Sequence, residues 1–153
     1  MYRYILVPLD GSKTAERGLR EAIRFADAQK TKGKLHLVHV IDEFPTLVEL
    51  SSMNSFELSI QRLRDDGHAL LERAARTAAA ADVEADTALC EVTQGRIADA
   101  LVDEARKSGC DLIVMGTHGR RGFSRLALGS DADLVVRAST VPVLLVRDTS
   151  ADT

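Results

Sequence analysis

Short apolar runs that alternate with segments of helical periodicity are the feature that most constrains the fold of this chain. Residues 4–9 form a near-continuous apolar run, which is typical of a strand buried on both faces of a sheet. Four further strands are predicted at residues 35–41, 87–92, 111–115 and 141–146. Strands that alternate with helices predict βαβ units with right-handed crossovers, and therefore an α/β fold with a parallel sheet.

Helical spacing fills the intervals between these strands. Apolar residues recur three or four positions apart between Ala15 and Ala26, and again between Ile97 and Ala105. The last helix is predicted at Ser130–Ala138 and the longest at residues 53–81. The inward stripe of that long helix is expected to comprise Phe56, Ile60, Leu63, Leu70, Ala74 and Ala78.

Two further segments complete the expected architecture. Residues 42–52 contain Pro45 and are expected to form a loop. Residues 87–92 are more polar than the other strands, which favours an edge of the sheet. No composition shift or linker interrupts the chain, so residues 1–153 are expected to form a single domain.

Charge and composition exclude several functions. The net charge is −3 and aromatic residues make up 4% of the chain with no Trp, which argues against a nucleic-acid reader. No apolar stretch approaches the roughly 20 residues of a membrane span, so no membrane association and a cytoplasmic location are expected. Cys90 and Cys110 lack CxxC spacing, which favours buried free thiols over a metal or redox pair.

Two histidines in the second predicted strand are weak candidates for metal ligands. His36 and His39 are three residues apart, so they face opposite sides of the strand and are poorly placed to share a metal ion. We expect one of them to lie between the sheet and a helix.

The richest motif is the glycine-rich segment at residues 116–130, which reads GTHGRRGFSRLALGS. It begins where the fourth strand ends and finishes where the last helix begins. Glycine allows a ligand to approach the backbone closely, and the N–H groups of a helix that opens at Gly129 and Ser130 attract a phosphate. The segment also carries the polar or basic side chains of His118, Arg120, Arg121 and Arg125.

The spacing of Gly116, Gly119, Gly129 and Ser130 resembles the ATP-binding signature of the universal stress proteins. The segments at residues 5–12, 39–41, 111–116 and 141–143 are also similar to that family, so the resemblance covers essentially the whole chain. It implies a Rossmann-like fold with a five-stranded parallel sheet of order 3-2-1-4-5 and helices on both faces. It also implies a homodimer, for which residues 141–146 are the expected interface.

The resemblance implies an ATP site at the carboxyl ends of the strands. Asp10 would lie near the ribose or phosphates, Val40 would offer backbone groups to the adenine, and Ser130 would hold phosphate. The full set of expected nucleotide-binding residues is Pro8, Leu9, Asp10, Val40, Met115, Gly116, His118, Gly119, Arg120, Gly129, Ser130 and Asp131.

Asp131 departs from the family, which usually has Val or Thr after the Gly-Ser pair. A carboxylate about 5 Å from a phosphate charge would cost about 3 kcal/mol at an effective dielectric of 20. One reading is that Asp131 stabilises the helix N-terminus and points to solvent. The other is that Asp131 and Asp10 help to hold Mg²⁺ with the phosphates.

The expected function is therefore that of an ATP-binding regulatory or stress-survival factor, recognised by a protein partner yet to be identified. The sequence has no Walker motif and no Lys in the phosphate segment, so the chain is not expected to be an enzyme beyond weak hydrolysis. Three different functions stay open: a slow ATPase, a cyclic-nucleotide binder and a stress scaffold that binds no nucleotide.

Overall fold

Five parallel strands form one sheet in the order β3-β2-β1-β4-β5 in a computed structural model that describes residues 1–29, 32–49, 53–118 and 128–147. Every neighbouring pair of strands is parallel. The strands are β1 at Tyr4–Pro8, β2 at Lys34–Asp42, β3 at Ala85–Val92, β4 at Leu112–Gly116 and β5 at Val143–Val146. The predicted strand order is confirmed, and β3 lies at an edge as its polar composition indicated.

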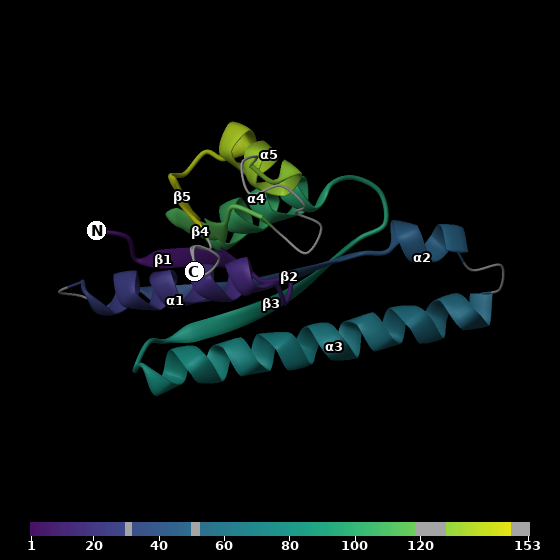
Figure 1. Cartoon of the computed structure of the whole chain (residues 1–153), viewed down its shortest axis with the longest axis horizontal. Helices are drawn as coiled ribbons and strands as arrows, with labels where there is room; N and C mark the ends of the chain where they lie inside the picture. The colour runs from purple at the N-terminus through teal and green to yellow at the C-terminus, as the bar shows by residue number, and fades with distance from the viewer. Residues whose placement is uncertain (30–31, 50–52, 119–127, 148–153) are drawn as a thin grey trace, which may run out of the picture.

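Helices cover both faces of the sheet. Figure 1 shows α1 (Lys13–Asp27) and α3 (Met53–Ala80) below the sheet, and α4 (Ile97–Ser108) and α5 (Ser130–Ala138) above it. Ser12 caps α1, because its Oγ atom accepts a hydrogen bond from the Ala15 N–H at 3.1 Å. Within the described residues, no helix is both long and apolar enough to cross a membrane.

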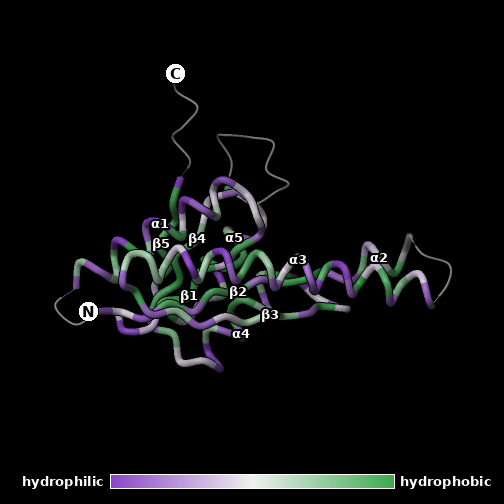
Figure 2. The backbone as a smooth tube through the Cα atoms, turned by 90° about the horizontal axis from the view of Figure 1, so that it is seen from below, coloured by the Kyte–Doolittle hydropathy of each residue, from purple (hydrophilic) through white to green (hydrophobic). Residues whose placement is uncertain are grey.

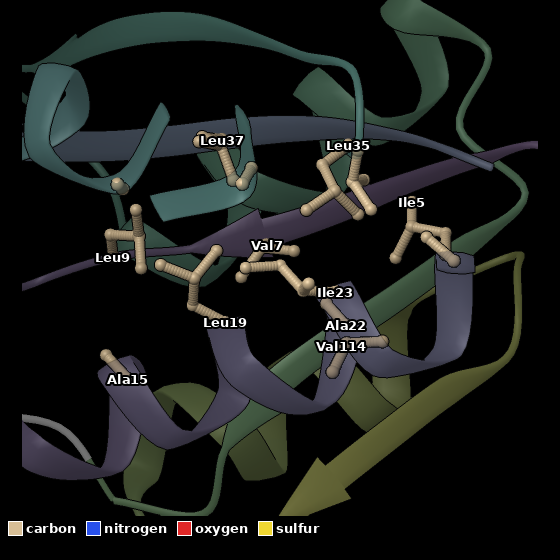
Figure 3. Close-up of a cluster of buried hydrophobic side chains, with 14 of the residues drawn as sticks. Ile5, Val7, Leu9, Ala15, Leu19, Ala22, Ile23, Leu35, Leu37 and Val114 are labelled. Carbon is tan, nitrogen blue, oxygen red and sulfur yellow. The ribbon is translucent and has the colours of Figure 1, made fainter. Parts of the chain in front are cut away.

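Successive residues of the strands point to opposite faces of the sheet and pack into two separate hydrophobic cores. Ile5, Val7, Leu35 and Leu37 face α1 and α3 in a buried cluster that Figure 3 shows at close range. Leu6 and its neighbours on the opposite face pack against α4 and α5. The strands are therefore buried on both sides, which explains why their sequences are near-continuous apolar runs rather than alternating ones.

The structure corrects the expectation of a loop at residues 42–52. A short helix, α2, spans Phe44–Glu49 and begins next to Asp42, whose carboxylate accepts a hydrogen bond from the Phe44 N–H at 3.1 Å. Pro45 stands in its first turn, where the missing N–H of proline costs no helical hydrogen bond. Figure 2 shows α2 and the adjoining end of α3 extending to one side of the sheet.

The inward stripe of α3 also differs from the expected one. Ile60, Ala74 and Ala78 are buried as expected, but Leu63 is 36% exposed and Leu71 is buried instead. After Ile60, the next buried residue of α3 is Gly67, which packs closely on β2 and β3. The helix face that carries Gly67 is therefore turned toward the sheet, and Leu63 lies outside this helix–sheet contact.

The last strand begins later than expected. The Val141 N–H donates to the Ser139 Oγ atom at 3.1 Å, which holds Val141 in a turn before β5. Pro142 still contributes its carbonyl, which accepts a hydrogen bond from the Ile113 N–H at 3.0 Å.

Candidate functional site

The expected site residues gather at one edge of the sheet, where the carboxyl ends of the strands meet. Asp10 follows β1, Val40 lies near the end of β2, and Gly116 ends β4. Since β1 has β2 on one side and β4 on the other, the chain changes direction across the sheet at β1. Ligands of open α/β sheets bind outside the carboxyl ends at such a point.

A tight turn fixes the segment after β1. The Asp10 Oδ1 atom accepts a hydrogen bond from the Ser12 N–H at 2.9 Å, and Gly11 adopts a φ of 80°, which favours glycine. Leu9 is only 5% exposed and its side chain points into the core (Figure 3). Leu9 therefore presents no side chain to a ligand, whereas Pro8 and Asp10 are half-buried at the edge.

The two ends of the glycine-rich segment are held together. The Thr117 N–H donates to the Val146 carbonyl at 2.9 Å, and the Gly129 N–H donates to the Thr117 carbonyl at 2.8 Å. A Cβ atom on Gly129 would lie 2.9 Å from that same carbonyl oxygen. Only a glycine fits this crossing without displacement, so Gly129 is needed where the segment returns to the sheet.

The N-terminal turn of α1 contacts the start of the glycine-rich segment, at Gly116 and His118. The Thr14 hydroxyl donates to the His118 carbonyl. A Cβ atom on Gly116 would lie 2.9 Å from backbone and side-chain atoms of Thr14. The end of β4 and the start of α1 therefore pack without intervening side chains, and Met115, the residue before Gly116, is buried against the α4–α5 face.

The N-terminus of α5 lies at this edge of the sheet, because the Gly129 N–H donates to the carbonyl of Thr117, the residue that follows β4. Gly129 is the N-cap residue and supplies no side-chain hydrogen bond to the helix. Ser130 is exposed and Asp131 is half-buried in the first turn. Backbone N–H groups at such a position favour a negative charge. Gly119 and Arg120, together with Arg121 and Arg125, lie outside the described residues.

Comparison with known proteins identifies the family. The sequence profile of the universal stress protein family matches residues 1–147. The chain belongs to the universal stress protein family. Universal stress protein MJ0531 of Methanocaldococcus jannaschii is 33% identical over 96% of this chain and 83% of its own length.

Solved universal stress proteins share this fold. The structure of MJ0577 from the same organism superposes with a TM-score of 0.85 at 26% identity and covers 99% of both chains. A universal stress protein solved in complex with cAMP has a TM-score of 0.66 at 26% identity, over 95% of this chain and 97% of its own.

The site of this universal stress protein is supported by three residues that the sequence analysis did not predict. Thr14 and Thr117 hold the glycine-rich segment, and His39 contacts the Leu9 carbonyl with its Nδ1 atom at 2.7 Å. The position of Thr14 just after the Asp10 turn was a usable signal. Nothing in the sequence indicated the contact of His39, because it crosses between two strands.

Among the described residues, no three His, Cys, Asp or Glu side chains are grouped so that they could hold a metal ion. His36 contacts α4 while His39 faces α3, so the expectation of opposite faces is confirmed, and both histidines lie between the sheet and a helix. Burial raises the pKa of the Cys110 thiol to about 12, as suits a core residue rather than a nucleophile.

A cleft of about 440 Å³ lies at the opposite edge of the sheet, near the amino ends of β2 and β3. Its charges pair with one another: Lys32 Nζ lies 2.6 Å from an Asp82 oxygen, and Lys34 Nζ lies 3.1 Å from a Glu84 oxygen. Because these cations and anions are mutually satisfied, the cleft offers no net charge for a phosphate. We therefore assign the candidate site to the carboxyl edge.

Proposed function

We propose that this universal stress protein binds ATP at the carboxyl edge of the sheet and acts as a nucleotide-dependent regulatory or stress-survival factor. One arrangement supports the proposal: the carboxyl ends of β1, β2 and β4 meet the N-terminus of α5, which has no side-chain cap. Hydrogen bonds hold together the two ends of the glycine-rich segment at the same edge. A protein partner would recognise the nucleotide-bound form. Turnover would be weak or absent.

The base would bind at β2. Backbone groups alternate in direction along a strand, so the N–H and C=O of Val40 point the same way as those of Val38, toward β1. The ladder between β1 and β2 ends at Pro8 and Val38, one step before Val40. A donor and an acceptor beyond the end of a ladder suit the edge of adenine, which presents both.

The ribose and phosphates would extend from β1 toward α5. Asp10 would accept hydrogen bonds from the ribose hydroxyls, and the first-turn N–H groups of α5 with the Ser130 hydroxyl would hold phosphate. Pro8, Leu9, Met115 and Gly116 would form the wall. His118, Gly119, Arg120 and Gly129 would complete the phosphate end. Asp10 or Asp131 would help to hold Mg²⁺, which would offset the negative charge of the phosphates.

Solved relatives support an adenine nucleotide as the ligand class. The universal stress protein that was solved with cAMP has the same fold and is 26% identical to this chain. A cyclic nucleotide is the second candidate ligand here, because its single phosphate places less negative charge near Asp131 than a triphosphate does. A scaffold that binds no nucleotide and a slow ATPase are competing functions, and the two experiments below distinguish them.

Calorimetric titration with ATP, with and without Mg²⁺, tests the proposal. We expect saturable binding by the parent protein that weakens without Mg²⁺ if Asp131 lies near the metal. The matched variant is Asp131→Val, which removes the carboxylate at similar size. Absence of binding by the parent with recovery in Asp131→Val would support the scaffold, while tighter cAMP binding would support the cyclic nucleotide.

Single-turnover measurement with ATP separates a binder from an enzyme. We expect the bound nucleotide to remain ATP over many minutes, since the sequence supplies neither a Walker lysine nor an evident base besides Asp10. Rapid appearance of ADP in the parent, lost in Asp10→Asn, would contradict this part of the proposal.

A further inference from the structure

The end of β1 is joined to β2 by a side chain where a backbone hydrogen bond would be expected. The Leu9 N–H donates to the Val38 carbonyl at 2.8 Å, which continues the parallel ladder by one bond. In the next bond of such a ladder, the Val40 N–H would donate to the Leu9 carbonyl. That bond is missing from the described residues, and the Leu9 carbonyl instead accepts from His39 Nδ1 at 2.7 Å.

The imidazole of His39 is held in this position from its other side. A Cβ atom added to Gly67 of α3 would lie 2.8 Å from the His39 Cδ2 atom and 2.7 Å from a methyl carbon of Leu89. The helix therefore approaches the ring as closely as a glycine allows. This packing restricts the rotation of the ring and directs its Nδ1 atom toward the Leu9 carbonyl.

Because the His39 side chain, and not the Val40 N–H, bonds to the Leu9 carbonyl, the geometry of the candidate site changes at this point. If the Val40 N–H completed the ladder, β1 would remain paired to β2 as far as Leu9, and the Val40 N–H would be used within the sheet. Because His39 supplies the donor, the carbonyl of Leu9 is satisfied and the strand separates one residue earlier. The Val40 N–H then stays outside the ladder, next to the turn that carries Asp10.

We propose that His39 is a positioning residue for the base-binding end of the site: it takes the place of the Val40 N–H at the Leu9 carbonyl and so keeps that N–H for an adenine ring. The inference rests on the proposed function for the identity of the ligand. The exchange of the hydrogen-bond donor rests on the geometry of Leu9, His39 and Val40 alone.

Three variants test the inference. His39→Leu removes the donor, whereas His39→Asn keeps an N–H close to the place of Nδ1. His68→Leu is the matched control, because His68 is an exposed histidine on α3. Thermal unfolding confirms that each variant is folded before binding is compared.

The first measurement needs no nucleotide. Amide hydrogen exchange followed by NMR reports whether the Val40 N–H is bonded within the sheet. We expect the Val40 amide to exchange at least about tenfold more slowly in His39→Leu than in the parent, His39→Asn or His68→Leu. An unchanged rate in His39→Leu would overturn the inference, whatever the protein binds.

The second measurement compares ATP with inorganic tripolyphosphate by calorimetry. We expect His39→Leu to bind ATP at least about tenfold more weakly than the parent and tripolyphosphate equally well, because only the base end has changed. His39→Asn should restore ATP binding to near the parent value. Equal loss for both ligands would overturn the inference, since it would indicate a general structural effect. Failure of the parent to bind ATP would overturn the proposed function, and the exchange rates would still decide the role of His39 at Leu9.

Discussion

The Nε2 atom of His36 lies 2.8 Å from the Oε1 atom of Glu104, which joins β2 to α4. The other ring nitrogen contacts Asp86 of β3, and the His36 residue is only 6% exposed. Two hydroxyls complete the cluster around the ring: the Tyr4 hydroxyl donates to Asp86 Oδ2 at 2.7 Å, and the Ser108 hydroxyl donates to Glu104 Oε1 at 2.9 Å. Three elements that are far apart in the sequence are thereby fixed by one buried side chain.

Replacement of Glu104 by Gln should destabilise the fold. His36 Nε2 and Ser108 Oγ both contact the Oε1 atom of Glu104, and Gln would leave this acceptor without its negative charge. A hydrogen bond to a charged group contributes about 1.5–3 kcal/mol, more than one between neutral groups. We expect a loss of about 1–3 kcal/mol in the free energy of unfolding, measured with urea. Asp103→Asn on the same helix breaks only an exposed pair with Arg106 and should cost less than about 0.5 kcal/mol. Equal losses would contradict this role for Glu104.

The destabilisation by Glu104→Gln should depend on pH. Burial alone would raise the pKa of Glu104, but hydrogen bonds from His36 and Ser108 outweigh burial and lower it. A carboxyl with a lowered pKa in the folded state stabilises the protein fully above its unfolded pKa of about 4.3, and this contribution is lost as the pH falls through the folded value. The difference between the urea midpoints of parent and variant should therefore be largest at pH 7 and shrink toward pH 3. A constant difference would argue against the charge of Glu104 as its source.

Much of this architecture was predictable because the apolar runs are long and buried on both faces. The α2 helix was missed because a six-residue segment that includes a proline carries little periodicity. The His36 cluster was missed for a different reason. Its carboxylates, Asp86 and Glu104, are 50 and 68 residues away, so no spacing in the sequence reports their approach.

Gly116→Ala should weaken both the fold and nucleotide binding. The added methyl group would lie 2.9 Å from the Thr14 backbone, so α1 must move away from the end of β4. Overpacking of this kind costs about 1–3 kcal/mol, and we expect ATP to bind about tenfold more weakly. Gly109→Ala is the control, because Gly109 has a φ of 72° but ends α4 at a position with open space for a methyl group. That variant should lose about 1 kcal/mol of stability with unchanged ATP affinity.

The exposed edge at β5 should mediate self-association. Leu144 is 39% exposed on this edge strand, and pairing of two such strands across a two-fold axis would cover it. Val143 and Leu145 pack partly against the core on the α4–α5 face, so charges there would disturb the fold as well. We therefore choose Leu144→Lys and expect a shift from dimer to monomer in light scattering. A parent protein that is monomeric at high concentration would contradict the β5 interface.

Some residues of the candidate site could be predicted from the sequence, whereas the residues that support them could not. The glycine spacing and the strand ends located Asp10, Gly116 and Ser130 at one edge, because parallel strands bring their carboxyl ends together. The supports of the site depend on contacts between distant elements. Thr14 reaches the His118 carbonyl across 104 residues, and His39 reaches Leu9 across 30.

The most direct test of a nucleotide site at the carboxyl edge is a map of the residues that respond to ATP. Backbone amide signals of the isotope-labelled protein would be followed by NMR as ATP is added. We predict saturable shifts at Asp10, Val40, Gly116 and Ser130, with no shifts around Lys32 at the opposite edge of the sheet. Shifts confined to the cleft near Lys32, or no shifts at millimolar ATP, would contradict a nucleotide site at the carboxyl ends of the strands.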